Sequence, residues 1–257
     1  MTVKLHYEIS GAGEPLVLVM GLGADGSLWE QHVESYARHF RCILVDNRGA
    51  GNSPKPAGPY TTEMMAQDTL TLMDELGIES ARAAGISMGS GIAQQMALLA
   101  PGRIRSMVLI SSWARCDQYM KDVFEQFARI RPQVSAEHFM QVLQLWIFTP
   151  GHFSSKFSDL LDGRKNALFN PMPDHAFAAQ CAACSEHDTL DRLGDMHAPC
   201  LLTVGDADIF TPLRCSQEMH ERLPGSELSV FPGLGHCHHW EDLEAFNAVT
   251  TRFLLDH

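Results

Sequence analysis

The chain has 257 residues, of which 45% are hydrophobic and 19% charged, a composition that excludes a disordered or fibrous protein. Its formal net charge of −12 provides no excess of cations for phosphate backbones or anionic lipids, so we expect no nucleic-acid or membrane partner. Residues 1–9 alternate polar and apolar side chains and lack the apolar core of a signal peptide, which predicts a cytoplasmic protein.

Short runs rich in Val, Ile and Leu alternate along the chain with stretches of helical period. This pattern predicts an α/β fold with a mostly parallel sheet covered by helices. Strands are expected at residues 3–9, 16–20, 41–46, 82–86, 105–110, 200–204 and 226–231. Helices are expected between them at residues 27–40, 62–76, 88–100, 213–223 and 239–255.

The alternation stops between Ser111 and Ala198, where the pattern is helical throughout. A long stretch without strands inside such a chain indicates an inserted helical subdomain. We therefore divide the chain into a core of residues 1–112 and 198–257 and a helical cap of residues 113–197.

Aromatic side chains gather in the predicted cap, and most of them are expected to form its own core. A minority is expected to line an apolar pocket between cap and sheet, because ligand sites favour such junctions. Trp113, Trp146 and Phe148 are the candidates for binding substrate there.

The seven cysteines are odd in number, scattered, and set mostly among apolar neighbours, which predicts buried free thiols. Cys181 and Cys184 have the CxxC spacing of redox and zinc sites, but they fall in an alanine-rich helical stretch without a second CxxC. The run His236-Cys237-His238-His239 also suggests a metal site, although consecutive residues do not easily face one ion. We expect no metal.

Two glycine motifs in the first half of the chain favour different functions. Gly21-Leu22-Gly23-Ala24-Asp25-Gly26 is a GxGxxG between a predicted strand and a predicted helix, and the next strand ends in Asp46. This arrangement matches the fingerprint of dinucleotide binding, in which helix amides hold a pyrophosphate and the acid binds a ribose hydroxyl. Taken alone, it favours an NAD-dependent oxidoreductase.

The second motif, Gly85-Ile86-Ser87-Met88-Gly89, is a GxSxG between a predicted strand and the helix at 88–100. A nucleophile on such a tight turn is raised above the sheet edge in a strained conformation, and flanking glycines relieve the crowding. The amino end of the following helix favours developing negative charge. Ser87 is therefore a candidate nucleophile, against the plain alternative of a glycine-rich turn.

Partners for Ser87 follow in the order acid and then histidine, which this architecture requires. Asp206 and Asp208 lie in the loop after the sixth predicted strand, and His236 lies in the loop after the seventh. These loops leave the carboxyl ends of strands expected to be neighbours, so the three groups converge. The pattern does not show which of the two carboxylates, Asp206 or Asp208, is the acid that pairs with His236. His236 is the candidate general base.

These features make the whole chain resemble the α/β-hydrolase family. It is most similar to small bacterial members, which include 3-oxoadipate enol-lactonases, bromoperoxidase-like esterases and aminoacrylate hydrolases. The segments that carry the resemblance are residues 20–23, 46–53, the GxSxG, 205–212, and His236 with Phe246.

The resemblance implies the α/β-hydrolase fold and a serine hydrolase without metal or cofactor. Its GxxD pattern favours Asp208 as the acid of a triad with Ser87 and His236. The expected substrates are small esters, lactones or related acyl compounds, cleaved through an acyl-enzyme. Epoxide hydrolases and haloalkane dehalogenases of the family use an aspartate at the position of Ser87, so both activities are disfavoured.

The resemblance also reassigns the GxGxxG to an oxyanion-hole loop, with Asp46 opening the loop after the next strand. It implies that the backbone N–H groups of Leu22 and Met88 bind the oxyanion. Met20 stands where family members usually carry a histidine, which replaces a polar side chain with an apolar one. Arg48 is expected to form a structural salt bridge rather than to bind an anionic substrate.

Two other functions stay open beside the esterase or lactonase. A C–C bond hydrolase of a ring-cleavage product, or a cofactor-free perhydrolase, would use the same triad. A signalling protein would keep the triad but act by binding a ligand and a partner. The side chains of the predicted cap identify neither the acyl group nor the leaving group, and the chain is expected to be a monomer or a homodimer.

Overall fold

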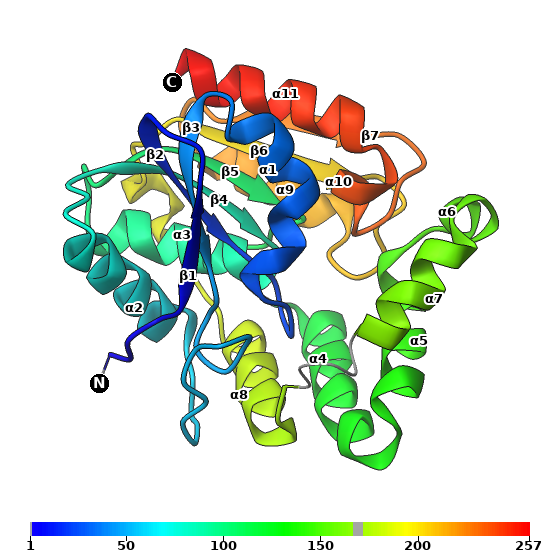
Figure 1. The fold of residues 1–257 in the computed structure, drawn as a ribbon. Coiled ribbons are helices and arrows are strands. Elements are labelled where there is room, and N and C mark those ends of the chain that lie inside the picture. The colour runs from blue at the N-terminus through cyan, green and yellow to red at the C-terminus, as the bar shows by residue number, and fades with distance from the viewer. Residues whose placement is uncertain (1, 167–171) are drawn as a thin grey trace.

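A seven-stranded sheet forms the centre of the protein in the computed structural model, which describes residues 2–166 and 172–257 (Figure 1). The strand order is β1-β3-β2-β4-β5-β6-β7, and every described pairing is parallel except that of β1 with β3. The strands are β1 (Tyr7–Ser10), β2 (Glu14–Val19), β3 (Phe40–Val45), β4 (Ala81–Ile86), β5 (Ile104–Ile110), β6 (Cys200–Gly205) and β7 (Glu227–Phe231). The predicted α/β fold with a mostly parallel sheet is confirmed.

The first strand is shorter than predicted, because it begins at Tyr7 and not at residue 3. Side chains bind the backbone ahead of it: the N–H of Val3 donates to Asp68, and the N–H of His6 donates to Ser53. These N–H groups therefore bind side chains of a helix and a loop instead of a neighbouring strand. Alternating polar and apolar side chains do not show whether an extended segment pairs with a strand or with side chains.

Helices cover both faces of the sheet, as the alternation of side chains along β2 requires. Leu16 and Leu18 pack in one core layer with α1 (Glu30–Tyr36) and α11 (Leu243–Asp256). Val17 and Val19 pack in the other layer. That layer includes residues of α2 (Thr62–Glu75), α3 (Met88–Leu99) and α9 (Leu213–Arg222). A strand buried on both faces has a continuous apolar run, which is why the sequence shows the strands so clearly.

Two predicted helices are interrupted. The one at 27–40 consists of a 3₁₀ turn, η1 (Gly26–Trp29), followed by α1, which ends at Tyr36. The one at 239–255 consists of α10 (His238–Glu241) and α11. Asp242 separates these two helices, since its side chain accepts a hydrogen bond from the N–H of Ala245 and caps a new helix. No helix within the described ranges is long and apolar enough to cross a membrane.

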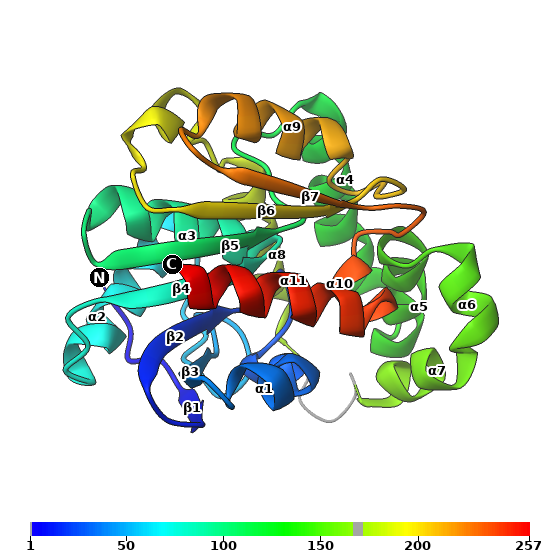
Figure 2. The same cartoon turned by 90° about the horizontal axis from the view of Figure 1, so that it is seen from above.

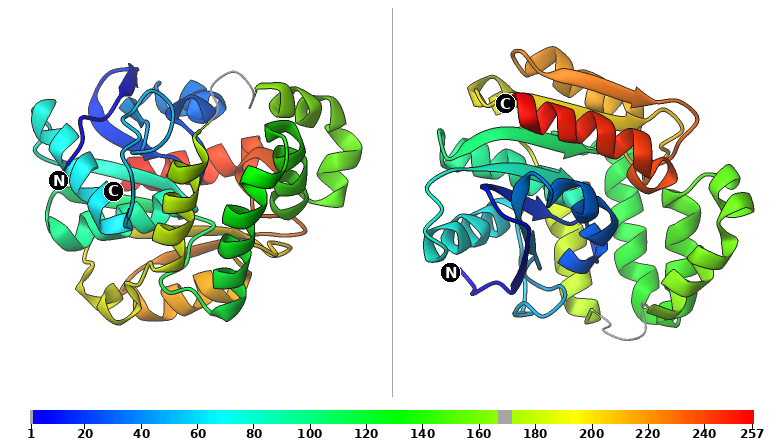
Figure 3. Two further views of the ribbon diagram at one scale, coloured as in Figure 1. Left: turned by 90° about the horizontal axis from the view of Figure 1, so that it is seen from below. Right: turned by 45° about the horizontal axis from the view of Figure 1, so that its top comes forward.

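Between β5 and β6 the regular elements of the described residues are all helical. They are α4 (Gln118–Ile130), η2 (Arg131–Gln133), α5 (Ala136–Ile147), α6 (Pro150–Ser155), α7 (Phe157–Asn166), α8 (Asp174–Ser185) and η3 (Leu190–Asp195). We call α4 to α8 the helical insertion. Figures 2 and 3 show α4 to α7 gathered beside one end of the sheet. Aromatic contacts tie the insertion to the loop after β6, because Phe124 and Phe127 both pack against Phe210.

All seven cysteines are free and buried, which confirms the prediction of buried thiols. Burial raises the pKa of Cys181 to about 12 and that of Cys184 well above its ordinary value. Redox exchange and metal binding both use the thiolate form. We therefore interpret Cys181 and Cys184 of α8 as two packed side chains rather than as a redox or metal pair.

Candidate active site

Ser87 lies on the turn between β4 and α3 with backbone angles φ 53° and ψ −116°. A positive φ is uncommon for a residue with a side chain, and it marks a turn that its surroundings hold in place. At Gly89 the backbone of α3 lies so close to β2 that a Cβ atom would collide with the carbonyl oxygen of Val19. The close approach requires glycine and keeps Ser87 at the end of the strand.

Asp208 and His236 form a buried pair. The carboxylate Oδ2 of Asp208 is 2.9 Å from Nδ1 of His236. The other oxygen, Oδ1, accepts hydrogen bonds from the N–H groups of Phe210 (2.8 Å) and Thr211 (2.9 Å). Burial by itself would raise the pKa of Asp208, but the charge of His236 and the hydrogen bonds of His236 and Thr211 outweigh it and lower that pKa. An ionised Asp208 can hold the imidazole with its Nε2 facing away as the proton acceptor.

The two carboxylates of this loop have different partners. Asp206 accepts a hydrogen bond from the N–H of Gly233 at 2.6 Å and is exposed. Only Asp208, among the two, contacts the ring of His236. The structure thus separates two candidates that the sequence pattern left together.

Ser111 joins the acid and histidine loops, and the sequence analysis did not single it out. Its hydroxyl donates to the carbonyl of His236 at 2.7 Å, and its own carbonyl accepts from the hydroxyl of Thr211 at 3.1 Å. Its backbone φ is 48°, and among the described non-glycine residues only Ser87 and Ser111 have a positive φ. Ser111 directly follows β5, which lies between β4 and β6 in the sheet. This position at the carboxyl end of a central strand is the sequence feature that could have identified it.

Ser87 and His236 line one cavity of about 670 Å³ beneath the helical insertion. Apolar side chains form much of its wall: Leu143, Ile147, Phe148, Phe139, Phe177 and Phe210. Within the described residues no hydrogen bond joins Ser87 Oγ to the ring of His236. Such bonds are often long before a substrate binds and shorten in the reacting complex.

Comparison with known proteins identifies the family. The family model for the alpha/beta hydrolase fold matches residues 14–243. The chain belongs to the α/β-hydrolase family. This hydrolase is 28% identical to a protein of Azorhizobium caulinodans provisionally named carbamate hydrolase RutD, over 96% of this chain and 90% of that protein.

Two solved structures are similar to the hydrolase over nearly its whole length. The enol-lactonase from Burkholderia xenovorans LB400 has a TM-score of 0.90 at 27% identity, covering 98% of this chain and 96% of its own. A thermophilic esterase from Thermogutta terrifontis has a TM-score of 0.88 at 26% identity, covering 98% and 93%. These proteins share the fold of the hydrolase and bear names of acyl-cleaving enzymes.

The structure separates the three aromatic residues predicted to bind substrate. Phe148 lines the cavity of the hydrolase, whereas Trp113 and Trp146 do not. Trp113 is fully buried, with its ring 5.6 Å from that of Phe124, and Trp146 packs edge-on against Phe127 at 5.8 Å. The assignment of both tryptophans is corrected accordingly: they are packing residues. The sequence showed that aromatic residues gather in the predicted cap, but it did not show which way each side chain points.

The family resemblance assigns the oxyanion hole to the amides of Leu22 and Met88. Leu22 lines the cavity, while Met88 is fully buried and is the first residue of α3. Neither N–H donates a hydrogen bond within the described residues. The first N–H groups of a helix have no partner inside it, so the amide of Met88 is available to an acceptor beside Ser87.

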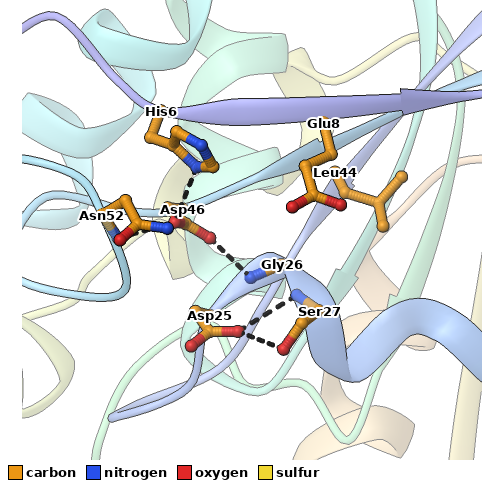
Figure 4. Close-up of a pocket in the computed structure, with 8 residues that line it drawn as sticks. All are labelled: His6, Glu8, Asp25, Gly26, Ser27, Leu44, Asp46 and Asn52. Atoms are coloured by element: carbon orange, nitrogen blue, oxygen red, sulfur yellow. Dashed lines mark hydrogen bonds and ion pairs between the residues drawn. The ribbon is translucent and has the colours of Figure 1, made fainter. Parts of the chain in front are cut away.

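Asp46, the acid of the dinucleotide fingerprint, binds groups of the hydrolase itself (Figure 4). Its Oδ1 accepts from the N–H of Gly26 at 2.8 Å, and its Oδ2 accepts from the N–H of Asn52 at 2.8 Å and lies 3.0 Å from Nδ1 of His6. The carboxylate thus ties the GxGxxG loop to the loop after β3. The dinucleotide interpretation is wrong for this family member, because its acid and its glycine amide satisfy each other.

Arg48 forms the predicted salt bridge. Its Nε lies 2.6 Å from Oδ2 of Asp68 and its Nη2 lies 2.8 Å from Oδ1, with both side chains buried. This bidentate pair links the loop after β3 to α2. The guanidinium is therefore engaged in structure rather than turned toward the cavity.

The histidines after His236 do not face one site. Nε2 of His238 lies 3.0 Å from the hydroxyl of Thr203, and the ring of His239 packs 5.5 Å from that of His32 and 4.6 Å from that of Trp240. Burial lowers the pKa of His238 to about 3 and that of His32 to about 4. Both side chains are buried and neutral near pH 7.

We expect the hydrolase to lose stability between pH 7 and pH 5 because of such histidines. Burial lowers the pKa of His32 and of His187 to about 4 and that of His238 to about 3, below the ordinary 6.5. Below pH 6.5 the unfolded chain therefore binds protons that the native protein does not. Stability is fully present above that pH and falls as the pH drops, by up to roughly 1.4 kcal/mol per pH unit for each histidine.

Urea unfolding at several pH values between 7 and 5 measures this slope, above the range in which most carboxylates titrate. His187→Gln should reduce the slope by about one histidine's share. His39→Gln, which changes an exposed histidine, is the matched control and should leave the slope as it is. An unfolding free energy that stays constant from pH 7 to pH 5 would contradict the prediction.

Proposed function

We propose that the protein is a metal-free serine hydrolase that cleaves a small carboxylic ester, lactone or related acyl compound through an acyl-enzyme. The observation that carries the proposal is the buried hydrogen bond between Asp208 and His236, at 2.9 Å, together with the cavity that His236 and the strained turn of Ser87 both line. Nucleophile, base and orienting acid are the three parts that this chemistry requires. The names of the similar proteins, an enol-lactonase and an esterase, support the same class of substrate.

In the proposed mechanism, Ser87 Oγ attacks the carbonyl carbon while His236 Nε2 takes its proton. The amides of Leu22 and Met88 stabilise the negative charge on the carbonyl oxygen. The tetrahedral intermediate collapses, and the leaving oxygen takes the proton from His236. Water then attacks the acyl-enzyme while the same imidazole takes its proton. The bond from the acyl carbon to Ser87 Oγ breaks, His236 returns the proton to Oγ, and the carboxylic acid product leaves.

The test is covalent labelling by a fluorophosphonate, followed by intact mass measurement. Ser87 Oγ attacks phosphorus and fluoride leaves, so the reagent reports an activated serine whatever the natural substrate is. We expect one adduct per chain in the wild-type protein. Ser87→Ala and His236→Ala should each abolish it, because one lacks the nucleophile and the other its base.

Ser106→Ala, which changes a buried serine of β5 outside the cavity, is the matched control and should be labelled like the wild type. A folded wild-type protein that forms no adduct would argue for the alternative in which the triad is retained for ligand binding. An adduct that persists in Ser87→Ala would place the nucleophile elsewhere.

A further inference from the structure

The loop of residues 20–26 contains Leu22 and is held by polar side chains from two directions. On one side Asn47 Nδ2 donates to the carbonyl of Met20 at 2.9 Å. On the other side Gln180, in α8 of the helical insertion, accepts a hydrogen bond from the N–H of Gly23 at 2.9 Å. Met20 has only a thioether to offer, so the anchoring of this loop depends on residues distant in the sequence.

Both ends of the Gln180 amide are used. While Oε1 accepts from Gly23, Nε2 donates to the carbonyl of Arg48 at 2.9 Å, and the side chain is fully buried. One side chain thus joins the GxGxxG loop to the loop after β3 and attaches both to α8. A carboxamide offers an acceptor to one partner and a donor to the other, which an ionised carboxylate of the same length does not.

Packing adds to the same contact. Gly23 has a backbone φ of 74°, and a Cβ atom built on it would lie 3.0 Å from the ring of Phe177, one turn before Gln180 in α8. The helix therefore lies close to the loop at the residue whose N–H it binds. A shift of one relative to the other would break this partly buried hydrogen bond.

We propose that Gln180 is a positioning residue that holds the N–H of Leu22 in place for the developing oxyanion. This inference rests on the proposed function. The hydrogen bond fixes the peptide plane between Leu22 and Gly23, which leaves little freedom for the amide just before it. Donors that are already oriented stabilise the transition state without reorganising, so loss of the anchor should act on kcat more than on KM.

Kinetics of p-nitrophenyl acetate hydrolysis with two variants test the proposal. Gln180→Met keeps the length of the side chain but makes no such hydrogen bonds, and we expect kcat to fall about 10- to 100-fold with KM within about twofold of wild type. Gln180→Glu keeps an acceptor of the same length for the N–H of Gly23 and loses only the donor for the carbonyl of Arg48. Its kcat should therefore stay at least about fivefold above that of Gln180→Met, a rescue that a purely structural role of the amide does not predict.

The matched control is Gln94→Met. Gln94 is also fully buried and also bridges two segments, since it accepts from the hydroxyl of Thr189 and donates to Ser112 and to the carbonyl of Trp113. It makes no hydrogen bond to residues 20–26, so the kcat of its variant should stay within about threefold of wild type. This control separates loss of a buried amide from loss of the anchor.

The outcomes are distinct. A Gln180→Met kcat within twofold of wild type, or a Gln180→Glu kcat as low as that of Gln180→Met, would overturn the inference and leave the proposed function standing. A wild-type protein without Ser87-dependent hydrolysis would overturn the proposed function, and the inference with it. If Gln180→Met does not fold, Gln180→Asn decides by the same comparison with Gln180→Glu, because its amide is one methylene too short to reach the N–H of Gly23.

Discussion

Replacing Ser87 with alanine is expected to lower kcat for ester hydrolysis by about four to six orders of magnitude. The expected loss is this large because no covalent intermediate can form, and His236 is left without the hydroxyl that it activates. What persists is the residual rate from the cavity and the oxyanion amides. The fold should be unaffected, since Ser87 Oγ makes no hydrogen bond within the described residues and alanine is the smaller side chain.

Steady-state kinetics with p-nitrophenyl esters, together with urea unfolding of the same samples, measure both parts of this expectation. The unfolding midpoint should match that of the wild type, so that a lost rate reports chemistry and not misfolding. A kcat within tenfold of wild type would show that another group attacks the carbonyl.

Changing Asp208 to asparagine is expected to lower kcat by about four orders of magnitude. The asparagine amide can donate to Nδ1 of His236, which favours the imidazole form that carries its proton on Nε2. That form cannot accept the proton of Ser87. The buried carboxylate oxygens also accept from Phe210 and Thr211, so part of the loss reflects a loop held less firmly.

Asp206→Asn is the natural control, because it makes the same chemical change two residues earlier in the same loop. Asp206 is exposed and binds the N–H of Gly233, and its variant should keep kcat within about threefold of wild type. Equal losses in the two variants would contradict the assignment of the acid. Parallel measurement of kcat at pH 8 for both variants is sufficient.

Local patterns predicted those parts of the molecule that depend on neighbours in the sequence. The strands buried on both faces were visible as apolar runs, and the GxSxG marked the turn of Ser87 because its shape depends on adjacent glycines. The order of Ser87, Asp208 and His236 followed from strand ends. The choice between Asp206 and Asp208 needed the family pattern, and the hydrogen bond to His236 agrees with it.

Other features depend on contacts between distant segments, which no local pattern records. Ser111 binds the loop of His236, and Gln180 binds Gly23 from a helix 157 residues further along the chain. Trp113 and Trp146 were expected in the cavity because they are aromatic, yet Trp113 is fully buried against Phe124 and the partly buried Trp146 packs against Phe127. Side-chain direction about a helix axis was the missing information.

The proposed triad draws its members from the ends of β4, β6 and β7, and β7 is the edge strand of the sheet. No fragment of the chain that lacks the last strands contains all three groups. Since His236 follows β7 and Asp208 follows β6, we expect His236 to reach Asp208 during refolding only when β7 pairs with β6. We therefore expect enzymatic activity to return only once the edge strand β7 has paired. Activity would then report complete folding, whereas secondary-structure content would already be high before β7 pairs.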